Sequence, residues 1–296
     1  MDMKNKFEFK EKYNIYDLVE IMRVLRSEGG CPWDIKQTHE SIKKNLIEET
    51  YETIEAINKK DPDMLREELG DVLMQVVFHS QIEAEKGVFD IDDVADENCK
   101  KLIERHPHVF GEVNVNGVDD VLTNWDAIKR KSKGQKSTSE AIDSIPRELP
   151  ALMRATKVQH KAAKAGFDWD NVNGALDKLT EEISELKAAI ANNDKANINE
   201  ELGDVLFSAV NVSRFVDTDA EESLTDATDK FVSRFKTVEK LAKERDIDMN
   251  ESDIETLDRL WDEAKQKKLA NDSFGRAWCI GSLKDFIIKN WRNYNE

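Results

Sequence analysis

The heptapeptide Glu-Glu-Leu-Gly-Asp-Val-Leu stands at residues 67–73 and recurs unchanged at residues 200–206. Around it, residues 48–73 align without gaps with residues 181–206, and 13 of the 26 positions are identical. Each copy follows a Glu-Glu-x-x-Glu cluster by the same interval, so the acidic residues recur as one set. A duplicated chain that keeps its carboxylates at helical spacing keeps a charge arrangement, and this arrangement indicates a divalent-metal site.

The composition restricts the partners of the chain. Its 296 residues include 44 Lys and Arg against 61 Asp and Glu, a net charge of −17. This balance argues against a nucleic-acid polymer as partner, because phosphate backbones are bound through basic surfaces. A single nucleotide remains compatible, since a cation held by carboxylates can bind its phosphates. No signal peptide or membrane-spanning segment is visible and the three cysteines are scattered, so we expect a cytoplasmic protein that does not contact a membrane.

The hydrophobic periodicity predicts helices almost everywhere, and strand signals are weak. Asp61 and Pro62 form a good helix start, with Asp as the N-cap and Pro at the first helical position. We therefore predict an all-α fold of two tandem, related helical bundles. The predicted helices lie near 15–25, 38–58, 62–86, 92–105, 118–131, 152–165, 175–192, 195–215, 220–245 and 254–269. The predicted organisation is a first repeat at 1–130, a linker at 131–150, a second repeat at 151–270, and a tail at 271–296 that could form a docking helix.

The acidic residues should converge between two helices of each repeat. Residues three apart share one helix face, and a short connection should pack the two helices antiparallel. Four carboxylates would then repel one another unless a cation neutralises them, and ligation by oxygen alone suits Mg²⁺, with Mn²⁺ as a possible substitute. The predicted metal ligands are Glu49, Glu52, Glu68 and Asp71 in the first repeat, and Glu182, Glu185, Glu201 and Asp204 in the second.

Three alternative roles for the acids fit the sequence less well. A Glu-rich helix face is usually solvated surface, but two copies with the same spacing favour the metal site. A di-iron carboxylate bundle needs Glu-x-x-His, and none of the five histidines has a Glu three residues before it. An EF-hand starting at Asp217 would place Glu222 where Gly is required.

Basic and aromatic residues recur in the two repeats as well. A Lys-x-x-x-Arg pair and a Trp-x-x-x-Lys pair each appear twice, and a spacing of four places each pair on one helical face. Singly, such pairs are more often surface residues, but Lys and Arg can neutralise a polyphosphate and Trp can stack on a base. The candidate substrate-binding residues are Lys101, Arg105, Trp125 and Lys129 in the first repeat, and Lys230, Arg234, Trp261 and Lys265 in the second.

Together with the acids, a series of ordered segments resembles the MazG-type all-α nucleoside triphosphate pyrophosphohydrolases. The resemblance runs from about residue 16 to residue 269. The matching segments are Gly30–Asp34, Gln37–Ser41, Arg105–Gly111, Leu149–Leu152, Ala165–Trp169 and Leu260–Lys265.

The resemblance implies Mg²⁺-dependent cleavage of ribo- and deoxyribonucleoside triphosphates between the α- and β-phosphates, giving a monophosphate and pyrophosphate. It further implies house-cleaning of abnormal nucleotides and a homodimer. The predicted metal ligands and the basic and aromatic pairs would then hold the metal and the nucleotide. The chain departs from the family pattern at Thr228, where Asn is expected.

Two questions stay open at this level. Glu48 and Glu181 are not needed as metal ligands, so either could accept the proton of an attacking water. Both repeats keep their acids, and only the family analogy favours the second repeat as the catalytic one. The alternative function is a non-catalytic sensor that binds metal and nucleotide without turnover.

Overall fold

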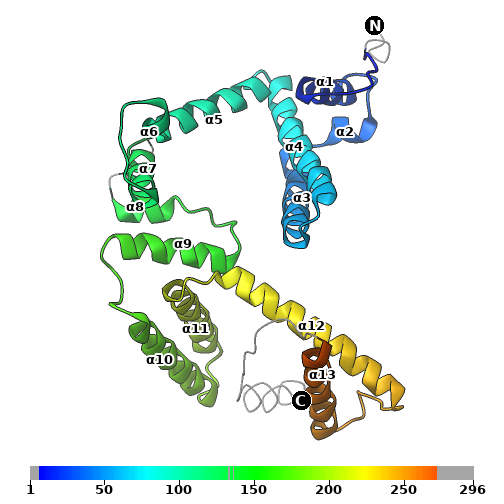
Figure 1. Ribbon diagram of the computed structural model, residues 1–296, viewed down its shortest axis with the longest axis vertical. Coiled ribbons are helices and arrows are strands. Elements are labelled where there is room, and N and C mark those ends of the chain that lie inside the picture. The colour runs from blue at the N-terminus through cyan, green and yellow to red at the C-terminus, as the bar shows by residue number, and fades with distance from the viewer. Residues whose placement is uncertain (1–6, 133, 136, 272–296) are drawn as a thin grey trace. The chain divides into compact units, whose positions relative to one another are not determined.

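The computed structural model describes residues 7–132, 134–135 and 137–271, and within them the chain is helical and contains no strand (Figure 1). The all-α prediction is therefore confirmed. The chain divides into two compact units, residues 1–134 and 135–296. Across the described residues, no helix combines the length and apolar character needed to cross a membrane. The helix predicted for the tail falls at 272–296, outside the described residues.

The first unit consists of helices that pack around the one carrying the repeated motif, followed by further helices along the chain. The elements are α1 (Ile15–Arg26), α2 (Pro32–Lys36), α3 (His39–Lys59), α4 (Pro62–Glu85), α5 (Ile91–Arg105), α6 (Pro107–Phe110) and α7 (Val118–Ser132). The core of this unit forms where α1, α3 and α4 meet, and its buried residues are Met22, Ile42, Val77, Phe78 and Ile82.

The second unit follows the same order of long helices. Its elements are α8 (Thr138–Asp143), α9 (Ala151–Lys164), α10 (Val172–Ala191), α11 (Lys195–Phe215), α12 (Ala220–Glu244) and α13 (Ile254–Asn271). A buried cluster joins α12 to α13 through Val238, Leu241, Ala242, Leu260 and Ala264. The stretch 131–150, predicted as a linker, contains the short helix α8, whose Ala141 is buried.

Side-chain caps define the helix starts on which the repeat depends. Thr38 caps α3 by accepting a hydrogen bond from the backbone N–H of Ser41 at 3.3 Å. Asp61 caps α4, with Pro62 at the first helical position as predicted. The start predicted near 175 is three residues late, because Asn171 caps α10 and the helix begins at Val172.

The structure preserves the register of the duplication. Helices α3 and α10 begin at residues 39 and 172, and α4 and α11 begin at residues 62 and 195, which is the offset of the repeated motif. Ala56 and Ala189 occupy matching places and are 0% and 1% exposed. A buried alanine at each hairpin interface lets the two helices approach closely, and this brings their carboxylates within reach of each other.

Candidate active site

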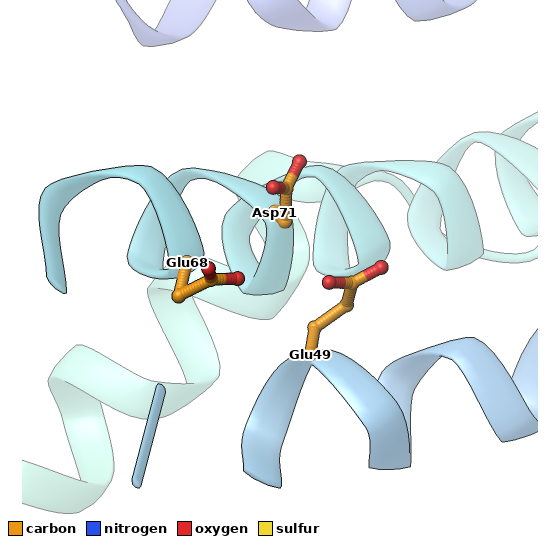
Figure 2. Close-up of side chains that lie close together, drawn as sticks. All are labelled: Glu49, Glu68 and Asp71. Atoms are coloured by element: carbon orange, nitrogen blue, oxygen red, sulfur yellow. The ribbon is translucent and has the colours of Figure 1, made fainter. Parts of the chain in front are cut away.

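In the first unit, three carboxylates from α3 and α4 converge. Ligand oxygens of Glu49, Glu68 and Asp71 all lie within 4.8 Å of one another. Figure 2 shows Glu49 rising from α3 toward α4, where Glu68 and Asp71 lie on neighbouring turns. Three oxygens at this separation, with no nitrogen or sulfur donor among them, form a donor set that suits a hard divalent cation.

The carboxylates of this cluster repel one another, and two of them have raised pKa values. Burial raises the pKa of Glu49, and the charges of Asp71, Glu52 and Glu68 raise it further. Burial also raises the pKa of Glu68, and Glu52 adds to this through its charge and a hydrogen bond. Glu52, which is also a predicted ligand, lies beside the cluster and is hydrogen-bonded to Glu68. A divalent cation would remove the repulsion that shifts these groups.

The second unit repeats the arrangement with its own differences. Oxygens of Glu182, Glu201 and Asp204 lie within 4.8 Å of one another, and Glu182 is only 5% exposed. Burial raises the pKa of Glu201, and the charges of Glu185 and Glu182 raise it further. Glu185 lies beside this cluster, hydrogen-bonded to Glu182, as Glu52 lies beside the first.

A lysine that the sequence analysis did not single out enters the second cluster. Lys178 Nζ lies 2.6 Å from Glu182 Oε1 and 2.9 Å from Glu181 Oε1, and these carboxylates raise the pKa of the ammonium group. Asn45 occupies the matching position of the first unit. The four-residue spacing of Lys178 and Glu182 is the signal that could have revealed it, since such residues share a helix face. The two acidic clusters therefore differ by one internal cation.

The basic and aromatic pairs come together within each unit. The guanidinium carbon of Arg105 lies 5.3 Å from the centre of the Trp125 ring, and Lys129 Nζ lies 4.8 Å from it. Arg234 stacks on Trp261 in the same way at 5.9 Å. In both arginines the Nε atom is buried without a hydrogen-bond partner. A planar cation with an unused buried donor is suited to an anion such as a phosphate.

The two kinds of cluster lie on different helices. The acids lie on α3, α4, α10 and α11, whereas the basic residues belong to α5, α7, α12 and α13 (Figure 1). Among the described residues, no ion pair links Lys101, Arg105, Lys230 or Arg234 to the acidic clusters. Lys265 instead pairs with Asp262 at 3.0 Å. Each unit by itself thus presents a carboxylate site and a separate cationic site.

Comparison of the sequence with known proteins identifies the family to which the chain belongs. A model described as the MazG nucleotide pyrophosphohydrolase domain matches residues 37–110 and again residues 171–240. A Thermotoga maritima protein named nucleoside triphosphate pyrophosphohydrolase/pyrophosphatase MazG is 49% identical over 249 residues, which are 84% of this chain and 94% of the relative. The chain belongs to the MazG family. Both family matches contain an acidic hairpin and the helix that follows it, so the duplication is a duplication of the MazG domain.

Further relatives align with the chain over similar numbers of residues. The Escherichia coli K12 protein named nucleoside triphosphate pyrophosphohydrolase is 44% identical over 255 residues, covering 85% of this chain and 97% of the relative. A Bacillus subtilis protein called YabN, described as uncharacterized, is 47% identical over 249 residues, which are 83% of this chain and 50% of that protein. The MazG matches end at residues 110 and 240, so Trp125, Lys129, Trp261 and Lys265 lie beyond them.

Proposed function

We propose that this chain is a Mg²⁺-dependent hydrolase that cleaves nucleoside triphosphates between the α- and β-phosphates and releases a monophosphate and pyrophosphate. The observation that carries the proposal is the pair of carboxylate clusters, each formed by two helices of one MazG domain and each holding acids whose pKa is raised. The names of the relatives in Thermotoga maritima and Escherichia coli support the same substrate class.

The proposed metal ligands are the clustered acids with their neighbours. A bound Mg²⁺ or Mn²⁺ would supply charge neutralisation for the phosphates and a more acidic water. The carboxylates of each hairpin hold the ion by oxygen alone. The proposed ligands are Glu49, Glu52, Glu68 and Asp71 in the first unit, and Glu182, Glu185, Glu201 and Asp204 in the second.

The remaining residues have roles at the nucleotide. Glu48 and Glu181 are exposed, lie next to a cluster residue in the chain and belong to neither cluster, so each could accept a proton from the attacking water. The stacked arginines would bind phosphate oxygens through their unused donors, and the tryptophans would cover the base. We assign these roles to Lys101, Arg105, Trp125, Lys129, Lys230, Arg234, Trp261 and Lys265.

We assign catalysis to the second unit, because among the described residues an ion pair with a lysine is found in its cluster and not in that of the first unit. When metal neutralises Glu182, the ammonium of Lys178 becomes available for a phosphate oxygen, and Asn45 cannot offer this in the first unit. We further propose broad action on ribo- and deoxyribonucleotides in the cytoplasm, in the house-cleaning of abnormal nucleotides. Thr228, which hydrogen-bonds to the carbonyl of Leu224 on α12, would influence the choice of nucleotide.

We propose that the working form is a homodimer. The repeated heptapeptide exposes leucines in both units: Leu69 is 51% exposed and Leu202 is 48% exposed. Between each leucine and the following Asp stands a glycine, Gly70 or Gly203, and a methyl group added there would meet no atom within 4 Å. Glycine inside a helix costs about 1 kcal/mol relative to alanine, so its repetition suggests close approach by another surface. A second copy could also bring a cationic site to an acidic one.

The homodimer proposal can be tested with one substitution that should raise helix stability and weaken self-association. Gly203→Ala should stabilise the isolated helix by about 1 kcal/mol, because alanine has the higher helix propensity and the space is open. The same change should weaken self-association, measured by sedimentation over a dilution series. Unaltered association would contradict the assignment of this face to a second copy.

Product analysis tests the enzymatic proposal. The purified chain is incubated with a panel of ribo- and deoxyribonucleoside triphosphates and Mg²⁺, and the products are separated. We expect monophosphate and pyrophosphate, lost when a chelator is added. Diphosphate with orthophosphate would refute the cleavage site, and bound nucleotide without turnover would favour the sensor.

Matched variants of the heptapeptide locate the active unit. Glu201→Gln removes a cluster carboxylate, whereas Glu200→Gln makes the same change at an exposed neighbour outside the cluster. Glu68→Gln and Glu67→Gln form the same pair in the first unit. We expect Glu201→Gln to abolish turnover while its helices remain folded. We expect Glu200→Gln to retain turnover. Wild-type rates in Glu201→Gln would refute the assignment to the second unit.

A further inference from the structure

The first unit contains a chain of three polar side chains that the proposed function does not use. His39 is the first residue of α3 and lies against the last turns of α4. Its Nδ1 lies 2.7 Å from Nδ1 of His79, and its Nε2 lies 2.6 Å from Oε1 of Glu83. The two imidazole planes are 5° from parallel, and the ring centres are 5.0 Å apart. These contacts tie the start of one hairpin helix to the end of the other.

The geometry limits how many protons the two imidazoles can carry. The carboxylate of Glu83 accepts the Nε2–H of His39, so the Nδ1 of His39 is free to face His79. With both rings neutral, His79 donates its Nδ1–H to His39; with one extra proton, one Nδ1 still carries a hydrogen and the other still accepts it. With two extra protons, both Nδ1 atoms carry hydrogen, the hydrogen bond is lost, and two positive charges face each other.

The neighbouring charges do not remove this limit. Directly after α4, Lys86 also binds Oε1 of Glu83, at 2.6 Å, so that carboxylate is already shared between two donors. On α3, Glu40 lies near His39 and Lys86 and is exposed. From α1, Arg26 approaches α4 but pairs with Glu85. Burial and the charge of His39 both lower the pKa of His79, which agrees with the resistance to a second proton that the geometry implies.

The second unit shows that the fold does not need these polar groups. With the offset of the repeat, the places of His39, His79 and Glu83 are taken by three valines: Val172, Val212 and Val216. Helix α10 nevertheless begins at Val172, the same place in the register. The polar chain is therefore a feature that the first unit has in addition to the shared hairpin.

We propose that His39, His79 and Glu83 form an acid-sensitive latch on the hairpin of the first unit. The latch holds while the two imidazoles carry at most one extra proton between them, and it opens when both are protonated. Because the open form takes up a further proton, its population rises as the pH falls. The hairpin it closes carries Glu49 and Asp71, so opening loosens the acidic cluster of the first unit and leaves that of the second unchanged.

Hydrogen exchange of the full chain between about pH 7.5 and about pH 5.5 tests the latch. After correction for the intrinsic pH dependence of exchange, opening at residues 39–45 and 79–86 should rise as the pH falls. The rise should approach tenfold per pH unit below the ordinary histidine pKa of about 6.5. Residues 172–178 of the second unit should show no such rise. An equal rise in both units would overturn the proposal.

The variant for this test comes from the chain itself. His39→Val, His79→Val and Glu83→Val together install the residues of the second unit and should make opening of the first unit independent of pH. A purely structural role predicts altered protection with an unchanged pH slope, and that result would overturn the latch. Should the triple variant fail to fold, histidine NMR of the wild-type chain decides. We expect the hydrogen bond between the Nδ1 atoms of His39 and His79 to be lost as the pH falls toward about 5.5, and its retention at that pH would refute the proposal.

Discussion

Ala189→Leu should separate the helices that hold the second acidic cluster. Ala189 is 1% exposed and lies on α10 two turns beyond Glu182, at the interface with α11. A leucine adds three carbon atoms to a space already filled, so α10 and α11 must move apart or the side chain must strain. Overpacking of this kind costs about 1–3 kcal/mol of unfolding free energy.

The substitution should affect Mg²⁺ binding at the proposed site more strongly than it affects the stability of the fold. Mg²⁺ binds oxygen at about 2.0–2.1 Å, so two ligand oxygens on opposite sides of one ion lie about 4.2 Å apart. Ligand oxygens of Glu182, Glu201 and Asp204 lie within 4.8 Å of one another, close to the span that one ion can bridge. A further separation of about 1 Å would take one ligand out of reach, and a loss of at least about tenfold in Mg²⁺ affinity follows.

The neighbouring alanine supplies the control. Ala188 is exposed on the same helix, so Ala188→Leu should change stability by less than about 0.5 kcal/mol. Urea unfolding measures stability, and calorimetric Mg²⁺ titration in a Glu68→Gln background isolates the second site. If Ala189→Leu loses stability and still binds Mg²⁺ as tightly as Ala188→Leu, the close approach of α10 and α11 does not set the metal site.

Three further predictions concern charge and stacking. The pKa values of Glu49 and Glu68 are raised, so the metal-free fold holds their protons more tightly than the unfolded chain does and loses stability as the pH rises through these pKa values. Mg²⁺ must displace the same protons in order to bind. Its stabilising effect on Tm should therefore shrink as the pH falls from about 7.5 to about 5. Differential scanning calorimetry with and without Mg²⁺ measures this, and a constant effect would contradict it. Asp168→Asn removes the carboxylate bound by the buried guanidinium of Arg214, and urea unfolding should show a loss of about 1–3 kcal/mol. Arg234→Lys keeps the charge but loses the planar stack on its tryptophan, so steady-state kinetics should show KM for the triphosphate rising by about tenfold, with little change in Tm.

The hairpins could be predicted from the sequence because strong local signals coincide there. Thr38 and Asp61 are side-chain caps, and Pro62 stands where a helix tolerates it, so the starts of α3 and α4 needed no tertiary information. The short helices α2 and α6 were not predicted, since each is too brief to show a hydrophobic period. Each starts at a proline, which is the one local signal it carries.

The acidic residues of the candidate site could be predicted from the sequence, but their arrangement around the cluster could not. Helical spacing and a short connection were enough to expect Glu49, Glu68 and Asp71 together. Spacing alone could not show that Glu52 stays beside this cluster, because that depends on the rotation of one helix against the other. The exposure of Leu69 was equally out of reach, since periodicity identifies an apolar face without saying what covers it.

Because Lys178 stands in the second unit where the first unit has Asn45, we expect the two halves of the chain to respond differently to a shortage of the proposed metal. Glu182 has an ammonium group at 2.6 Å, whereas the charges of Asp71, Glu52 and Glu68 raise the pKa of Glu49. We therefore expect a fall in free Mg²⁺ to destabilise the acidic cluster of the first unit before that of the second. One acidic cluster would then depend on the proposed ion for its charge balance, and the other would keep the ammonium group of Lys178 as a partial substitute.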